Sequence, residues 1–210
     1  MSATNSNAQS AAQSIDAHNL SFAPKPPTFT SKAEEREWLK FRLAQAFRIF
    51  GHLGYNEGVA GHITVRDPIQ PDCFWVNPFG LHFSLIQPSD LLLVDVGPTG
   101  TYNSDSQAAI LQNHGLLVAT NTIEATVFFY IALERACQAQ LLADAAAGGR
   151  GGRPLRIPDE EALKTSKTNG NMTAGWFQGL PEFQFLEARE GVTFAFNKGK
   201  DAKGDLKPSN

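Results

Sequence analysis

Residues 58–66, with the sequence GVAGHITVR, join a glycine-rich turn to a short run of alternating apolar and polar side chains. Glycines ahead of a strand let the backbone approach a ligand closely and leave N–H groups pointing outward, which suits an anion. The alternation places Thr64 and Arg66 on one face of the strand, opposite Ile63 and Val65. The alternative is a plain glycine turn before a strand whose arginine is solvated. The segment predicts a strand and leaves both interpretations of the turn open.

A long helix is predicted before this segment. Ser31 and Glu34 have the spacing of a helix capping box, and Gly54 is typical of a helix end. Apolar residues recur between them at steps of three and four, which indicates that one face packs against a larger body. The recurring positions are Leu39, Leu43, Ala46, Phe47, Phe50 and Leu53.

Short apolar runs bounded by turn residues follow. They predict strands, of which the run at 108–111 is expected to be buried. The predicted strands are residues 63–65, 74–76, 91–96, 108–111 and 116–119. A second long helix is predicted from a capping signature at 121–124 to about Ala147, and its first half is apolar on nearly all sides. Helices that flank several strands predict an α/β or α+β domain with a covered sheet.

Composition excludes several classes of protein. The chain of 210 residues has 18 basic and 21 acidic residues, a net charge of −3, and no basic run typical of nucleic-acid binding. Two cysteines do not make a disulfide framework. No apolar stretch approaches the roughly 20 residues of a transmembrane helix, and no targeting signal is visible. We therefore expect a cytoplasmic protein with a disordered leader at 1–31, one domain at 32–196 and a disordered tail at 197–210.

His114 is the most suggestive candidate for chemistry. It lies in an Asn-His-Gly turn between two apolar strands, where an imidazole could face a cleft as a metal ligand or a proton shuttle. The alternative is a single structural histidine hydrogen-bonded within its turn.

Taken in order, these pieces resemble the class II aldolase/adducin family. The resemblance covers about residues 32–147. It rests on the 58–66 strand, the turn at 76–80, the run DLLLVD at 90–95, the run LQNHGLL at 111–117 and the capped helix that follows.

The resemblance implies a three-layer αβα sandwich around a mostly antiparallel sheet, assembled as a ring-shaped tetramer. It implies a zinc-dependent aldehyde-lyase or epimerase that acts on a small phosphorylated or hydroxy-carbonyl substrate. His114 corresponds to the last of three zinc-binding histidines. The residues that correspond to the substrate-phosphate pocket are Gly61, His62, Thr64 and Gly80. In the adducins the same domain has no metal chemistry and has a cytoskeletal partner.

The chain departs from the family between residues 97 and 107, where a Gly/Ser/Asp-rich connection replaces the segment that carries a His-x-His pair and an acidic base. We therefore expect a sheet incomplete in its middle, and we suspect a skipped exon or a faulty gene model at this junction. The histidines present are His18, His52, His62, His82 and His114. Catalytic zinc needs three protein ligands. In this chain His62 and His82 would have to serve as the second and third ligands beside His114.

The departure predicts an impaired or non-catalytic domain in which no catalytic residue can be named. Glu124 and Glu134, on the second long helix, are interpreted as forming a cap and salt bridges there. The alternatives are the zinc-dependent lyase and an adducin-like interaction module.

Overall fold

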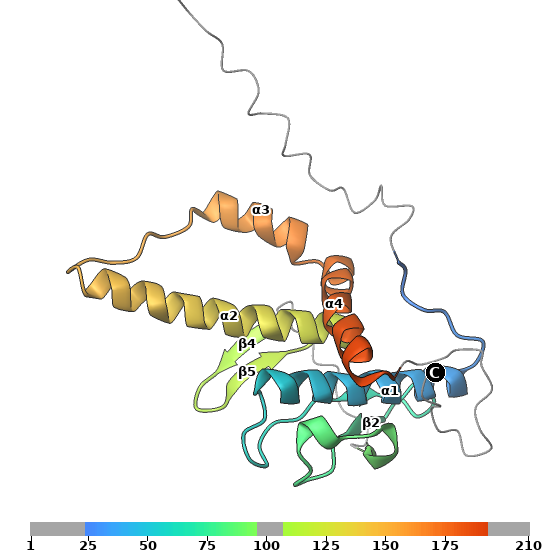
Figure 1. Cartoon of the computed structure of the whole chain (residues 1–210). Helices are drawn as coiled ribbons and strands as arrows, with labels where there is room; N and C mark the ends of the chain where they lie inside the picture. The colour runs from blue at the N-terminus through green and yellow to red at the C-terminus, as the bar shows by residue number, and fades with distance from the viewer. Residues whose placement is uncertain (1–23, 96–106, 193–210) are drawn as a thin grey trace, which may run out of the picture.

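The computed structural model describes residues 24–95 and 107–192. Most of the predicted leader at 1–31, the tail at 197–210 and nearly all of the 97–107 connection lie outside the described residues. In the described part, every helix is too short or too polar to cross a bilayer. Figure 1 shows the arrangement of the elements along the chain.

Helix α1, Lys32–Leu53, forms where the capping pattern predicts it. The Ser31 hydroxyl accepts a hydrogen bond from the Glu34 backbone N–H at 3.1 Å, and Gly54 ends the helix with φ of +79°. The side chains of Leu43, Ala46 and Phe47 are completely buried. The middle of α1 therefore forms the centre of the hydrophobic core.

A small antiparallel sheet packs against α1. Its strands are β1 (Val65–Arg66), β2 (Cys73–Val76) and β3 (Leu92–Asp95), in the order β1-β2-β3. Val65 pairs with Trp75, and Trp75 pairs with Leu93. The 3-10 turns η2 (Phe83–Leu85) and η3 (Pro88–Asp90) connect β2 to β3 and also contact α1.

A separate two-stranded hairpin consists of β4 (Ala108–Leu111) and β5 (Gly115–Val118). Among the described strands, neither pairs with the sheet of β1, β2 and β3. The expectation of a buried strand at 108–111 is wrong, because Ile110 is 70% exposed. The described strands thus form two sheets that do not pair with each other.

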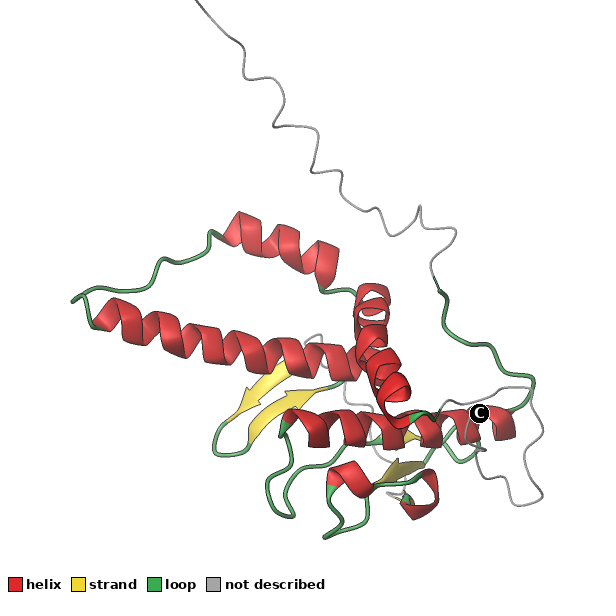
Figure 2. Cartoon of the chain, viewed as in Figure 1, coloured by secondary structure: helices red, strands yellow, loops and turns green. Residues whose placement is uncertain are grey.

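Three more helices complete the described chain: α2 (Ile123–Gly148), α3 (Asp159–Asn169) and α4 (Met172–Glu190). Helix α4 crosses α2 and packs on α1 (Figure 2). The crossing is close, because a Cβ placed on Gly179 of α4 would lie 2.3 Å from the Glu124 carbonyl oxygen of α2. Mixed helices and antiparallel strands confirm the predicted α/β class.

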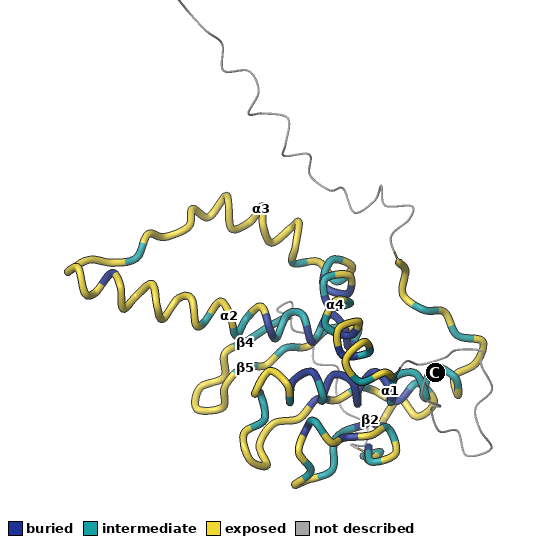
Figure 3. Tube along the Cα trace, in the orientation of Figure 1, coloured by how far each residue is buried: buried dark blue, intermediate teal, exposed yellow. Residues whose placement is uncertain are grey.

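Burial in α2 changes along its length. Val127 and Ile131 in the first half are buried, as expected for the half that is apolar on nearly all sides. The second half is exposed apart from Cys137, which is half-buried, and Ala147, which is buried, and α3 has no buried residue (Figure 3).

Candidate functional site

The antiparallel pairing of β1 with β2 brings two predicted binding segments to one end of the sheet. Residues 61–64 precede β1, and residues 77–80 follow β2, so both lie beyond the Val65–Trp75 pair. Gly61 and Gly80 have φ of +88° and +84°, which strongly favours glycine at both positions. The sheet thus places Gly61, His62, Thr64 and Gly80 at the same end, all of them exposed.

The face alternation predicted for this strand is observed. Ile63 is buried and Val65 is half-buried, whereas Thr64 and Arg66 are exposed. The regular strand is shorter than expected and includes only Val65 and Arg66. Asn77 directly follows β2 at the same end of the sheet. Its side-chain oxygen Oδ1 is buried and has no hydrogen-bond partner among the described residues.

His82 is engaged through both ring nitrogens. Its Nδ1 accepts a hydrogen bond from the Ser84 backbone N–H at 3.1 Å, which caps η2. Its Nε2 lies 2.6 Å from Asn56 Nδ2. This histidine fixes the connection after β2 against the loop after α1, so using it as a metal ligand would disrupt that contact.

His114 lies at the tip of the exposed hairpin. Its backbone N–H donates to the Leu111 carbonyl at 3.1 Å, and the turn places Asn113 at φ +56° and Gly115 at φ +106°. Within 24–95 and 107–192, no three His, Cys, Asp or Glu side chains are grouped so that they could hold a metal ion. The described residues therefore do not fit the three-ligand zinc centre that the resemblance implies.

A buried carboxylate that sequence analysis missed lies next to β1. Asp67 is 1% exposed and accepts hydrogen bonds from the Arg36 guanidinium at 2.7 and 2.8 Å and from Trp75 Nε1 at 2.7 Å. The backbone N–H groups of Ile69 and Gln70 also donate to it. Burial alone would raise the pKa of Asp67, but the donors outweigh it and hold that pKa at about 2. This carboxylate joins α1 to the sheet and has no lone pair left for catalysis.

A second missed cluster joins three helices. Arg42 of α1 donates to Glu124 of α2 at 3.0 Å, to Glu187 of α4 at 2.9 Å and to Gln45 at 2.7 Å. Its guanidinium also lies 4.4 Å from the centre of the Phe183 ring. The predicted salt-bridging role of Glu124 is observed, although the bridge is buried and leads to another helix.

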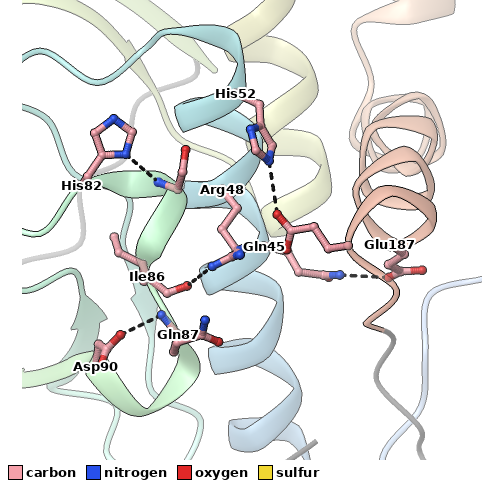
Figure 4. Close-up of polar contacts among 10 residues, drawn as sticks. Gln45, Arg48, His52, His82, Ile86, Gln87, Asp90 and Glu187 are labelled. Atoms are coloured by element: carbon pink, nitrogen blue, oxygen red, sulfur yellow. Dashed lines mark hydrogen bonds and ion pairs between the residues drawn. The ribbon is translucent and has the colours of Figure 1, made fainter. Parts of the chain in front are cut away.

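A cavity with a volume of about 80 Å³ lies between α1, η3 and the end of α4. Figure 4 shows polar contacts of residues around it, among them Arg48 and Gln87. Phe41, Ala44, Ile86 and Leu186 supply its apolar walls. Arg48 donates to Glu190 at 2.7 Å and to the Ile86 carbonyl at 3.3 Å. His52 Nε2 lies 3.2 Å from Glu190, so this histidine also joins α1 to α4.

The sequence is similar to the family described as "Class II Aldolase and Adducin N-terminal domain", which matches residues 41–106 and 99–141. The match is in two parts that share residues 99–106 of this chain. The meeting point coincides with the predicted departure from the family.

A solved structure, the L-fuculose 1-phosphate aldolase from Glaciozyma antarctica PI12, superposes with a TM-score of 0.71 at 34% sequence identity. The match covers 80% of this chain and 95% of that one. Decarboxylase NovR of Streptomyces niveus is 28% identical over 248 positions, covering 79% of this chain and 90% of that protein.

The meiotically up-regulated gene 14 protein of Schizosaccharomyces pombe is 51% identical over 69 residues. This match covers 33% of the present chain and 27% of that protein, so the similarity is high but confined to a short region.

Proposed function

Because the chain belongs to the class II aldolase and adducin N-terminal domain family, we propose that it serves as a binding module that keeps the family fold and lacks metal-dependent lyase chemistry. The position of His114 carries this proposal. A Lewis-acid zinc centre needs three protein ligands and one open position. The imidazole of His114 is exposed at a hairpin tip, and the described residues offer no second and third ligand beside it.

The alignment with NovR supports the same conclusion. It extends over 248 positions but includes only 79% of the 210 residues of this chain, or about 166. About 80 positions of that alignment therefore have no residue here. We place most of them at 97–107, where the two parts of the family match meet. The zinc-binding His-x-His pair and the acidic base of the family would belong to that absent segment.

The sheet end around Gly61 and Gly80 is the binding site of this module. Turns with positive φ at Gly61 and Gly80 leave room for an anion near the backbone, with His62 and Thr64 exposed beside them. The ligand we assign to it is a small phosphorylated or hydroxy-carbonyl compound, bound without turnover. The module acts in the cytoplasm as a homo-oligomer. A cytoskeletal partner of the adducin type remains the second candidate for its binding role.

An aldol-cleavage assay tests the proposal. The purified chain, supplied with zinc, is incubated with L-fuculose 1-phosphate, and the Glaciozyma antarctica aldolase serves as the positive control. We expect no cleavage by the wild-type chain and no difference between it and His114→Ala. Zinc-dependent cleavage that disappears in His114→Ala would establish the lyase alternative instead.

Phosphate binding is measured separately by calorimetry with the same compound. Binding by the wild-type chain that is weakened in Gly61→Val and Thr64→Val places the ligand at the sheet end. If neither substitution weakens binding of the compound, the sheet end is not its binding site.

A further inference from the structure

The connection between α2 and α3 begins with an arginine that has two glycines on each side. Residues 148–156 have the sequence GGRGGRPLR, and Arg150 is the centre of its first five residues. Figure 1 shows this connection beyond the end of α2, at the edge of the molecule and away from α1 and α4. Figure 3 shows that it is almost entirely exposed. An enzyme that modifies proteins can therefore reach Arg150 on the folded chain.

The fold strongly favours glycine at only one of the four positions around Arg150. Gly151 has φ of +72°, a conformation that other residues rarely adopt. A Cβ on Gly148 would meet nothing within 4 Å, although glycine is less favourable than alanine in a helix. A Cβ on Gly149 or Gly152 would make only ordinary contacts, at 3.4 and 3.8 Å from carbonyl oxygens of α2. Packing within the chain does not account for these three glycines.

The guanidinium of Arg150 is free to enter the pocket of another protein. It is exposed and makes no hydrogen bond or ion pair within the part of the chain that the structure describes. Arg156, six residues later, is also exposed, but it pairs with Asp159 at 2.8 Å and lies between two bulky neighbours, Leu155 and Ile157. The same connection thus contains a free arginine among glycines and a paired arginine without them.

The backbone around Arg150 can be extended at little cost. The backbone N–H groups at positions 150, 151 and 152 donate to carbonyls at the end of α2, at 2.9 to 3.1 Å, within an exposed turn. Residues 153–158 have no regular secondary structure. Hydrogen bonds of exposed turns open far more readily than those of the core. Once the turn is open, the absence of Cβ atoms lets the surface of an enzyme approach the backbone on both sides of the arginine.

A nucleic acid is not the favoured partner of this segment, because its charges cancel. Residues 144–164 contain four basic and four acidic side chains, namely Arg150, Arg153, Arg156 and Lys164 against Asp144, Asp159, Glu160 and Glu161. Glu134 and Arg135, earlier in α2, also cancel, and Lys167 adds one positive charge. Binding of a nucleic acid depends on an excess of positive charge. A free guanidinium between glycines instead suits an enzyme that admits one arginine side chain.

We propose that Arg150 is methylated by a protein arginine methyltransferase that uses a sulfonium methyl donor. A terminal guanidinium nitrogen attacks the methyl carbon of the donor. The N–C bond forms as the C–S bond breaks, and the sulfur keeps that electron pair and leaves as a thioether. The proton released by the nitrogen passes to a base of the methyltransferase. The side chain keeps its positive charge and loses an N–H donor. This inference does not depend on the metal chemistry of the chain.

Transfer of tritiated methyl groups tests the proposal. The full chain, purified from bacteria, is incubated with tritiated S-adenosylmethionine and a purified methyltransferase that accepts arginines flanked by glycine. A peptide of residues 145–157 tests the same sequence without the fold. We expect both to be labelled, and fragmentation in the mass spectrometer should place the methyl groups on Arg150. The variant Arg150→Lys should lose the label, whereas the matched variant Arg156→Lys should keep it.

The double variant Gly149→Ala with Gly152→Ala tests whether the glycines are needed. It should lose most of the label with unchanged circular dichroism, because the added carbons make only ordinary contacts. The chain isolated from its native cells should carry one or two methyl groups on Arg150. An unlabelled folded chain, label at Arg153 or Arg156 in place of Arg150, full labelling of the alanine variant, or an unmodified Arg150 in the native chain would each overturn the proposal.

Discussion

The guanidinium of Arg42 lies 3.0 Å from the carboxylate of Glu124, and both side chains are more than nine-tenths buried. The same guanidinium reaches Glu187, so one arginine of α1 is bonded to both α2 and α4. Buried charges are tolerated only when they are paired and hydrogen-bonded. This cluster therefore fixes the relative positions of the three helices that form most of the core.

Replacement of Arg42 by methionine should destabilise the protein strongly, by about 3–5 kcal/mol, because it leaves the buried Glu124 carboxylate without its partner. Urea unfolding followed by circular dichroism measures the loss. The control is Arg135→Met on the exposed side of α2, which should change the free energy of unfolding by less than about 0.5 kcal/mol. Equal unfolding midpoints for the two variants would contradict the assigned role of Arg42.

Acid should weaken the fold through Asp67. The pKa of this carboxyl is held at about 2 in the folded chain, below its ordinary value of 3.8. Its contribution is therefore fully present above about pH 5 and is lost as the pH falls toward 2, with a size on the order of 2 kcal/mol. Urea unfolding at a series of acidic pH values measures this loss.

The variant Asp67→Asn should be less stable at neutral pH and should lose that part of the pH dependence. Asp72→Asn, at an exposed neighbouring aspartate, should keep it. If the slope of stability against pH is the same in Asp67→Asn as in the wild-type chain, Asp67 is not the group responsible.

Gly179→Ala should separate α2 from α4. The added methyl carbon would lie 2.3 Å from the Glu124 carbonyl oxygen, so one helix must move, at a cost of about 1–3 kcal/mol. Gly148→Ala at the end of α2 meets nothing within 4 Å and should leave thermal stability unchanged or slightly higher. A Gly179→Ala protein with the same melting temperature as the wild-type chain would refute the close crossing of α2 and α4.

Ile110→Lys should reduce aggregation without changing the melting temperature, because Ile110 is 70% exposed on a hairpin whose strands pair only with each other in the described sheets. Light scattering during incubation at a temperature below the melting point measures the effect. Ile69→Lys, at another exposed isoleucine, should aggregate at the wild-type rate. Equal rates for all three proteins would mean that the hairpin is not the source of association.

Local signals in the sequence were sufficient for α1 and for the start of α2. The Ser31 cap, the apolar stripe ending at Gly54 and the cap at Thr122 predicted α1 and the start of α2, because capping and periodicity act within a few residues. The family resemblance added the choice of an α/β class with a mostly antiparallel sheet. It also located the departure near residues 97–107.

The buried clusters could not be predicted in the same way. Arg42 lies 82 residues from Glu124 and 145 from Glu187, so no local spacing reveals their contact. The exposure of the β4–β5 hairpin was missed for a different reason. An apolar strand indicates burial only when a partner layer exists, and among the described strands β4 and β5 pair only with each other.

The central claim is that the imidazole of His114 is a single remaining ligand and not part of a metal centre. Mass spectrometry of the metal content, after dialysis of the purified full chain against zinc and then against zinc-free buffer, tests it most directly. We predict zinc far below stoichiometric amounts, at the same level in His114→Ala. Zinc close to one ion per chain in the wild-type protein, and its loss in His114→Ala, would contradict the claim.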